Sequence, residues 1–269
     1  ALPISIKTST ERMLARKDGA VGWMIFNNPA RHNAVSVDMW RAVPEILGEF
    51  ERDDAIRTIV LAGAGGKAFV SGADISEFEE KRSSVDSVAE YNAISGRANA
   101  AIIDCRKPTI AMIQGYCIGG GLGVALCCDL RIASDNSRFA VPAAKLGLGY
   151  AYAGIKRLAD VVGPSFAKEI FFTARQFDAI EALQMGLVNR IRPLAELEAY
   201  VSNYAATIGG NAPLTVAAAK LCVNEYTKEP AERDLAAAAV AVDRCFASAD
   251  YIEGRTAFME KRKPAFKGR

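Results

Sequence analysis

The first third of the chain alternates apolar and polar residues in the way that half-buried strands do. Residues 13–26 alternate on both sides of an Asp-Gly pair at 18–19, which predicts a β-hairpin. A loop over residues 27–34, NNPARHNA, leads into a predicted helix at about 36–52, and residues 57–64, RTIVLAGA, form the next predicted strand. Strands that alternate with helices predict an α/β fold, in which helices cover the faces of parallel strands.

The densest apolar region covers residues 107–133, KPTIAMIQGYCIGGGLGVALCCDLRIA. A short apolar run between Pro108 and Gly115 predicts a buried strand, and three consecutive glycines and a predicted helix follow it. Glycine permits φ > 0, and the first N–H groups of a helix have no intrahelical acceptors, so this order presents backbone N–H groups to a ligand. They would stabilise a developing oxyanion. The glycines alone leave open the alternative that they only permit a tight turn and close helix packing, and their spacing is neither a Walker loop nor a dinucleotide fingerprint.

A second glycine-rich turn precedes this region, over residues 65–80, GGKAFVSGADISEFEE. Asp74 and Glu77 have the spacing of a helix capping box, and we favour that structural role over catalysis by the two carboxylates. Residues 81–99 are polar and weakly periodic, which predicts a loop and a helix lying over a site.

The second half of the chain begins with a further strand pattern and ends with helical patterns alone. Residues 128–134, CDLRIAS, predict a strand, and residues 137–158 predict a loop that becomes a helix. Beyond Pro193 the pattern is entirely helical, over residues 195–210, 213–226, 231–248 and 250–263. We therefore predict an α/β core at residues 1–193 and a helical region at 194–269, whose alanine-rich faces suit packing within the subunit or against another.

Composition narrows the classes of function. A chain of 269 residues, half of them apolar, can bury a large core, and a net charge of +2 does not indicate a nucleic-acid or membrane partner. No apolar run is long enough to span a membrane and the first residues do not resemble a signal peptide, so we expect a cytoplasmic protein. The single histidine, His32, cannot build a His-rich metal site. The cysteines lack C-x-x-C spacing and are expected to be reduced and buried: Cys105, Cys117, Cys127, Cys128, Cys222 and Cys245.

Six segments, in order along nearly the whole chain, resemble the crotonase or enoyl-CoA hydratase/isomerase superfamily. They are NNPARHNAV, KAFVSGADISEF, GYCIGGGLGVALCCDLRIAS, FAVPAAKLGLG, ARQFDAIEALQMGLVNRI and AFMEKRKPAF. The resemblance implies a crotonase spiral of ββα repeats over residues 1–193. It also implies a C-terminal helical region that builds homotrimers, often stacked into hexamers.

The same resemblance implies a site for an acyl-CoA thioester. The backbone N–H groups of Ala73 and Gly120 would form an oxyanion hole for the thioester carbonyl. The positions that would contact CoA are Arg31, His32, Ala34, Phe258 and Lys261. Phe258 and Lys261 would reach the adenine and 3′-phosphate of a neighbouring subunit's ligand, although a charge on a solvated helix end also explains Lys261. No separate cofactor and no metal is implied, because CoA is part of the substrate.

Two departures from the family pattern bear on the reaction. Gly123 and Ala143 stand where hydratases carry the two glutamates that position and activate water. Neither residue transfers protons, and the loss of one such group costs on the order of a hundred- to ten-thousand-fold in rate. Hydration of crotonyl-CoA is therefore doubtful, whereas loss of carbon dioxide from a malonyl-type thioester forms an enolate without a base.

Tyr150 supports that lyase chemistry through a local similarity to methylmalonyl-CoA decarboxylase, which also places a tyrosine there but has a histidine at the Ala73 position. A neutral phenol could orient a carboxylate or protonate an enolate, although an amphipathic core role explains Tyr150 equally well. Tyr91 and Tyr152 are weaker candidates of the same kind. Three alternatives stay open: a degenerate acyl-CoA-binding protein, a scaffold, and a hydratase or isomerase with a non-standard base.

Overall fold

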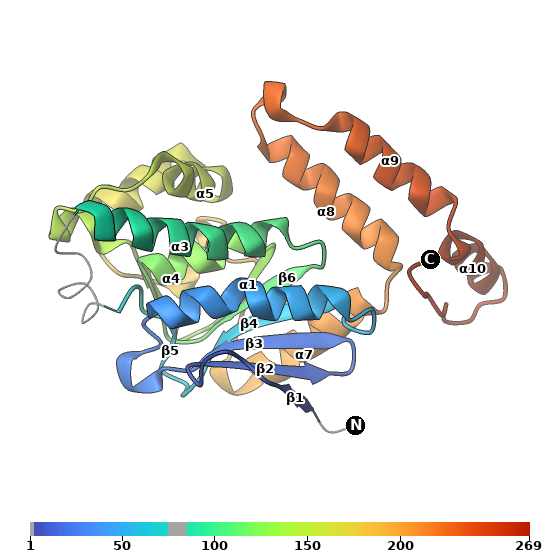
Figure 1. The fold of residues 1–269 in the computed structure, drawn as a ribbon, viewed down its shortest axis with the longest axis horizontal. Helices are drawn as coiled ribbons and strands as arrows, with labels where there is room; N and C mark the ends of the chain where they lie inside the picture. The colour runs from blue at the N-terminus through green and yellow to red at the C-terminus, as the bar shows by residue number, and fades with distance from the viewer. Residues whose placement is uncertain (1–2, 75–84) are drawn as a thin grey trace.

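The computed structural model describes residues 3–74 and 85–269, which form a two-sheet core with a projecting helical tail (Figure 1). The strands are β1 (Ile4–Ile6), β2 (Met13–Asp18), β3 (Val21–Phe26), β4 (Thr58–Gly63), β5 (Ala68–Val70), β6 (Thr109–Ile113), β7 (Tyr116–Ile118), β8 (Leu130–Ser134), β9 (Arg138–Ala140), β10 (Phe177–Asp178) and β11 (Arg190–Arg192). The α-helices are α1 (Val37–Arg52), α3 (Val85–Asp104), α4 (Gly120–Cys127), α5 (Tyr152–Thr173), α6 (Ala179–Gln184), α7 (Leu194–Gly209), α8 (Pro213–Thr227), α9 (Leu235–Phe246) and α10 (Ala249–Met259). Short 3-10 helices are η1 (Pro29–Arg31), η2 (Pro142–Leu146) and η3 (Pro230–Glu232).

The larger sheet has the order β1-β2-β3-β4-β6-β8-β11. Strands β2 and β3 pair antiparallel up to Asp18 and Val21, so Gly19, with φ of 57°, and Ala20 form the turn of the predicted hairpin. From β3 onward each neighbouring pair is parallel. The predicted α/β class with parallel strands is confirmed.

The smaller sheet has the order β10-β9-β7-β5, with β5, β7 and β9 parallel. The prediction that the strand after Pro108 leads directly into the glycine triplet is wrong. The predicted strand after Pro108 is β6 of the larger sheet, but the glycine triplet follows a further strand, β7, of the smaller sheet. Strand β7 has only three residues, of which Tyr116 is exposed and Cys117 is buried, so it carried too short a pattern to be recognised.

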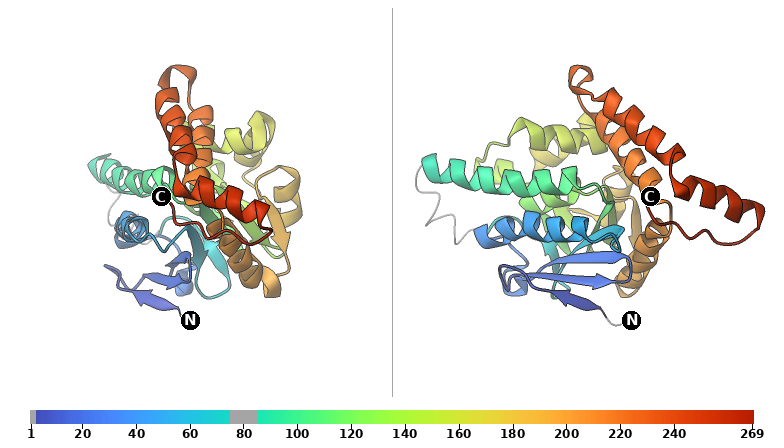
Figure 2. Two further views of the ribbon diagram at one scale, coloured as in Figure 1. Left: turned by 90° about the vertical axis from the view of Figure 1, so that its right-hand side faces the viewer. Right: turned by 45° about the vertical axis from the view of Figure 1, so that its right-hand side comes forward.

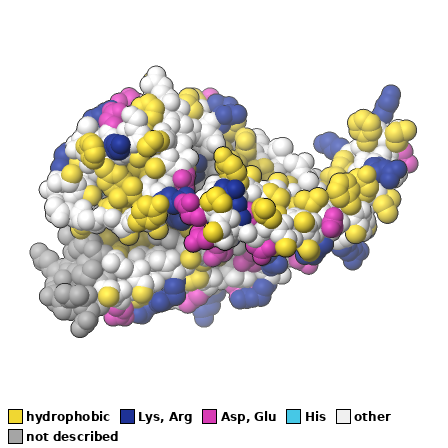
Figure 3. Space-filling model, turned by 90° about the horizontal axis from the view of Figure 1, so that it is seen from above, with side chains coloured by type: hydrophobic (Ala, Val, Ile, Leu, Met, Phe, Trp, Pro, Cys, Tyr) yellow, Lys and Arg dark blue, Asp and Glu magenta, His cyan; other side chains and the backbone are white. Residues whose placement is uncertain are grey.

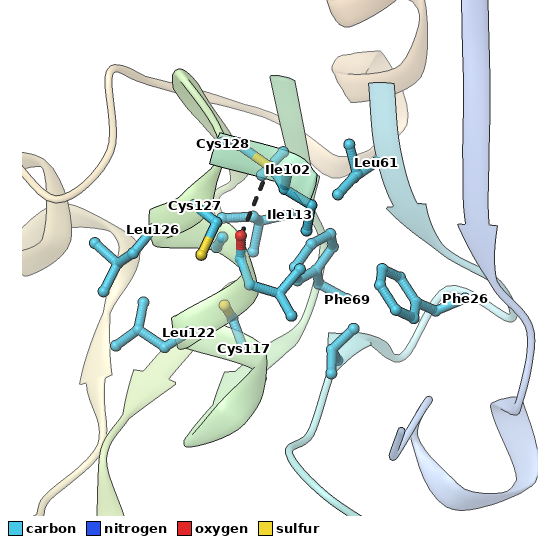
Figure 4. Packing of buried hydrophobic residues seen from close by; sticks show 14 of the residues in the cluster. Phe26, Leu61, Phe69, Ile102, Ile113, Cys117, Leu122, Leu126, Cys127 and Cys128 are labelled. Carbon is cyan, nitrogen blue, oxygen red and sulfur yellow. Dashed lines mark hydrogen bonds between the residues drawn. The ribbon is translucent and has the colours of Figure 1, made fainter. Parts of the chain in front are cut away.

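The core lies on both faces of the larger sheet because neighbouring residues of a strand point to opposite sides. Met24 and Leu61 join the main cluster with α1, α3 and α4, whereas Trp23 and Val60 pack under α7. Helix α4 is apolar on all sides and is enclosed by this main cluster (Figure 4). Six of its eight residues are buried, which holds the helix in place.

The last helices project from the core. Helix α7 packs on the larger sheet through Leu197, Val201 and Ala205, which are spaced four residues apart along one face. The following residues, 213–269, form what we call the C-terminal arm, in which α8, α9 and α10 extend away from the sheets (Figures 1 and 2). The predicted absence of strands beyond Pro193 is confirmed, and α7 is the one predicted tail helix that covers the larger sheet. None of the described helices is both long and apolar enough to cross a membrane.

Candidate active site

Two backbone turns meet at one edge of the smaller sheet. Strands β5 and β7 are adjacent and parallel, so the residues that follow them lie at the same edge. Ala73 comes three residues after the end of β5, and Gly120 comes two residues after the end of β7 and begins α4. The structure therefore brings together the two predicted oxyanion-hole residues.

The N–H group of Ala73 points away from its neighbouring chain segment. Val35 pairs with Ala73 in a parallel bridge, in which Val35 donates to the carbonyl of Gly72 at 2.8 Å and accepts from the N–H of Asp74 at 3.1 Å. These two hydrogen bonds involve the carbonyl of Gly72 and the N–H of Asp74, on either side of Ala73. The N–H of Ala73 itself has no acceptor among the described residues.

Gly120 supplies the second N–H group. As the first residue of α4 it has no helical acceptor, and it carries the positive end of the helix dipole. A Cβ atom added to Gly120 would lie 3.8 Å from the nitrogen of Ala73, and one added to Gly72 would lie 3.8 Å from the nitrogen of Gly120. Both donors thus border one small space that a side chain at either glycine would enter.

The glycine triplet has both functions that the sequence left open. Gly119 has φ of 55° and ψ of −117°, a conformation that only glycine adopts readily. A Cβ on Gly121 would come within 2.0 Å of the carbonyl oxygen of Val70, so Gly121 permits close packing of α4 on β5. Gly120 between them keeps the donor space open.

The predicted CoA-contact loop is fastened beside this space. Ser71 donates its N–H to the carbonyl of His32 and its hydroxyl to the carbonyl of Arg31. Buried Asn33 donates to the carbonyls of Ala64 and Ala68, which fixes the loop on β5. The loop that carries Arg31, His32 and Ala34 is therefore adjacent to Ala73, and its contact with CoA stays a prediction.

Asp74 has a role that sequence reasoning missed. Its carboxylate is 6% exposed and lies 3.1 Å from the guanidinium of Arg31. The ion pair joins residues 43 positions apart, which no local pattern could indicate. The predicted capping partner, Glu77, lies outside the described residues, so the capping box stays a prediction.

Arg131 was also missed, and it holds the far end of α4. Its guanidinium is buried and donates only to backbone carbonyls, at 2.7 Å to Leu187 and 2.8 Å to Cys128. Burial lowers the pKa of this group, and nearby acidic groups and thiols oppose the shift. Because α4 begins at Gly120, anchoring its C-terminal end also fixes the direction of the Gly120 donor.

Neither glutamate position of the family carries an acid. Gly123 lies one turn along α4 from Gly120, and a Cβ atom there would meet nothing within 4 Å. Ala143 is buried in η2, which follows β9 at the same edge of the smaller sheet. The Gly119 N–H donates to the carbonyl of Ala140 at 2.8 Å and keeps these segments together.

Tyr150 is half-buried between η2 and α5. Its ring packs edge-on against Phe171, with centroids 5.1 Å apart, and lies beside Gly154. Burial raises the pKa of the phenol above its ordinary value, so Tyr150 is a neutral donor at pH 7. No described residue forms a hydrogen bond with its hydroxyl group.

The weaker tyrosine candidates differ from Tyr150. Tyr91 accepts a hydrogen bond from the indole of Trp40 at 2.9 Å, and Tyr152 is 76% exposed at the start of α5. The buried thiols are poor nucleophiles, because burial raises the pKa of each; for Cys105 the pKa is about 11.

Phe258 and Lys261 are not brought to this edge within one chain. They lie at the end of α10, at the tip of the C-terminal arm, while β5 and α4 lie on the other side of the core (Figure 1). Phe258 is 82% exposed. Their contact with CoA across a subunit boundary stays a prediction.

Comparison with known proteins identifies the family of the chain. The family model described as enoyl-CoA hydratase/isomerase matches residues 16–269. The chain belongs to this family. It is 35% identical to a short-chain-enoyl-CoA hydratase of Clostridium acetobutylicum, over 96% of this chain and 98% of the relative. It is 34% identical to a crotonyl-CoA hydratase of Syntrophomonas wolfei, over 95% and 98%.

A solved structure described as an enoyl-CoA hydratase/carnithine racemase from Magnetospirillum magneticum shares the fold, with a TM-score of 0.91 and 33% identity over 97% of each chain. As an enoyl-CoA hydratase/isomerase family enzyme, the protein acts on CoA thioesters. These relatives carry hydratase names, and the similarity to methylmalonyl-CoA decarboxylase stays a prediction.

Proposed function

We propose that the protein forms a thioester enolate by loss of carbon dioxide from a malonyl-type CoA thioester. One observation carries this proposal. The donors of Ala73 and Gly120 border one open space, while the two neighbouring positions that would carry a proton-transferring acid are Gly123 and Ala143. Such a site can stabilise an enolate and lacks the usual base that would make one by removing a proton.

The reaction consumes one proton, which water or a protein donor supplies, and needs no other reactant. The bond between the α-carbon and the carboxylate carbon breaks, carbon dioxide leaves, and the electron pair of that bond becomes the enolate. Negative charge then grows on the thioester oxygen, where the two N–H groups donate; each such donor contributes about 3 kcal/mol in comparable sites. A proton returns to the α-carbon to give the shortened acyl-CoA.

The surroundings of Gly123 favour a substrate carboxylate. A glutamate at this position would oppose a second negative charge, by about 4 kcal/mol for unit charges 4 Å apart in a partly screened site. Glycine leaves the same volume open and uncharged. Tyr150 is our candidate for orienting the carboxylate or protonating the enolate, because its raised pKa keeps it a hydrogen-bond donor.

Hydration is the second candidate, and the names of the relatives favour it. It requires a positioned water and a group that moves its protons, which Gly123 and Ala143 do not supply. We expect crotonyl-CoA hydration to be slow by the hundred- to ten-thousand-fold that one lost proton-transfer group costs. A hydratase of ordinary rate would need a base elsewhere in the chain.

We also propose that the nucleotide of CoA is bound between subunits of a homotrimer or hexamer. The C-terminal arm exposes apolar side chains along its length, among them Val240, Phe246 and Ile252, and Figure 3 shows hydrophobic side chains along the projecting arm. Helix α9 has no buried residue in the single chain, which suits a helix that packs on another copy. Phe258 and Lys261 would then reach a neighbouring site.

The test compares substrates side by side. Purified protein is incubated with crotonyl-CoA, malonyl-CoA and methylmalonyl-CoA, and the products are identified by mass spectrometry. Decarboxylated product at a rate well above hydration supports the proposal. Hydration at about ten per second or faster would overturn it. Thioester binding without turnover of any of the three would instead support a binding protein.

A pair of double variants tests the role of the missing acids. Gly123→Glu with Ala143→Glu adds two carboxylates, and Gly123→Gln with Ala143→Gln adds side chains of the same size without charge. We expect the glutamate variant to lose at least tenfold more decarboxylase activity than the glutamine variant. Equal losses would show that size, not charge, matters at these positions.

A further inference from the structure

A second polar pocket lies at the opposite end of the strands that carry the active site. It has a volume of about 400 Å³ and is lined by His32, Gly66, Lys67, Gly115, Tyr116, Asn136 and Arg138. We call it the basic pocket. Lys67, Gly115 and Asn136 come just before β5, β7 and β9, whereas Ala73 and Gly120 follow the other ends of β5 and β7. Strands of three residues separate the two ends by roughly 10 Å.

The polar groups that line the basic pocket are cations or donors. No aspartate or glutamate lines it, and Lys67 and Arg138 form no ion pair with any described residue. The side-chain oxygen of Asn136 already accepts a hydrogen bond from Ser134 at 2.6 Å, so the amide NH₂ is the end left free to donate. Tyr116 adds a phenol whose ring packs edge-on against His32, with centroids 5.8 Å apart.

Arg138 has a nearby acid that does not neutralise it. The hydrogen bond with Arg175 is the main cause that lowers the pKa of Glu181. The charge of Arg138 also lowers this pKa, but it is the smallest of the causes. The carboxylate of Glu181 is held by Arg175 at 2.7 Å. One N–H group of Arg138 donates to the carbonyl of Ser137 at 3.0 Å, and the rest of its guanidinium fork remains for a ligand.

The segments that form the basic pocket are fixed to one another. The N–H of Tyr116 donates to the carbonyl of Lys67 at 3.2 Å, and that of Arg138 donates to the carbonyl of Gly115 at 2.9 Å. A Cβ atom on Gly115 would lie only 2.0 Å from the oxygen of Lys67, so the strand starts are in close contact. The strand starts that carry the two cations are therefore held together, while the exposed side chains of Lys67 and Arg138 become ordered when an anion binds.

We propose that the basic pocket binds a phosphorylated small molecule, whose phosphate lies between Lys67 and Arg138. Arginine and lysine with neutral donors around them are the usual partners of phosphate. A volume of about 400 Å³ exceeds that of phosphate alone and falls in the range of small-ligand sites, so the ligand carries a further group against Tyr116 and His32. This site is separate from the oxyanion hole and does not depend on the reaction proposed above.

The test measures binding by calorimetry with three probes: inorganic phosphate, pyrophosphate and ADP. Lys67→Gln with Arg138→Gln removes both cations, and Lys168→Gln with Arg190→Gln removes two exposed cations elsewhere as a charge-matched control. We expect the first pair to weaken pyrophosphate and ADP binding at least tenfold and the control pair to change it less than twofold. Inorganic phosphate should bind more weakly than the larger probes.

Three outcomes would overturn the proposal: no binding of any probe, equal weakening by both double variants, or complete competition by CoA. The last would show that the probes occupy the nucleotide part of the thioester site instead. His32 makes this control necessary, because its backbone belongs to the loop beside Ala73 while its ring faces Tyr116. The competition is measured with free CoA, so its result is independent of which thioester reaction occurs.

Discussion

The two ends of strands β5 and β7 offer an anion different kinds of partner. At one end the donors are the backbone N–H groups of Ala73 and Gly120, surrounded by glycine and alanine. At the other end they are the side chains of Lys67 and Arg138. Backbone donors are neutral and fixed, so they suit a charge that appears only during a reaction, whereas full cations suit a charge that the ligand already carries.

The comparison predicts that the two ends can be disabled separately. Gly120→Ala places a methyl group 3.8 Å from the nitrogen of Ala73, which fills the donor space without a steric clash. We expect turnover of the best thioester to fall by about a hundred- to a thousand-fold, as for the loss of an oxyanion-hole donor. Pyrophosphate binding in the basic pocket should not change. Steady-state kinetics and calorimetry on the same preparation measure both.

Gly96→Ala is the matched control for that variant, because its Cβ atom would meet nothing within 4 Å on the exposed side of α3. Replacing a helical glycine by alanine adds up to about 1 kcal/mol of stability where the conformation fits. Both variants should therefore melt at or above the temperature of the unmodified protein. Equal activity of the two would remove Gly120 from the site.

Features that depend on neighbouring residues in the chain could be predicted from the sequence, whereas contacts between distant residues could not. The hairpin, the glycine triplet and the helices of the tail were predicted because each depends on residues close in the chain. The Arg31–Asp74 ion pair and the hydrogen bond from Arg131 to the carbonyl of Leu187 were not, since they join residues 43 and 56 positions apart. The basic pocket combines one or two residues from each of four separate segments, and no one segment has a recognisable pattern.

Tyr150 is the only side-chain donor that we propose near Ala73 and Gly120, and it is neutral, unlike Lys67 and Arg138 at the other end. Tyr150→Phe keeps the ring against Phe171 and removes the hydroxyl, and we expect decarboxylation to fall tenfold or more. The active form is the protonated phenol, which is populated below its pKa. Because burial raises that pKa, activity that depends on this group should be lost only at a pH above that at which an exposed tyrosine ionises. A kcat profile from pH 7 to 11 measures this, with exposed Tyr152→Phe as the control. Equal rates in both variants would remove the Tyr150 hydroxyl from the mechanism.

The substitution of Lys261 has the smallest expected effect. Its effect on CoA binding shows which cation contacts the phosphate of CoA. If a neighbouring subunit supplies Lys261, Lys261→Glu should weaken CoA binding several-fold, and more strongly at low salt, because the interaction is a partly screened charge pair. Lys263→Glu changes charge equally at an exposed position two residues away and should have the smaller effect. Pyrophosphate binding in the basic pocket should be the same in both variants. If CoA affinity in calorimetry is unchanged by Lys261→Glu but falls with Lys67→Gln, then the nucleotide of CoA lies at the opposite end of β5, and the two ends of the strands serve one ligand rather than two.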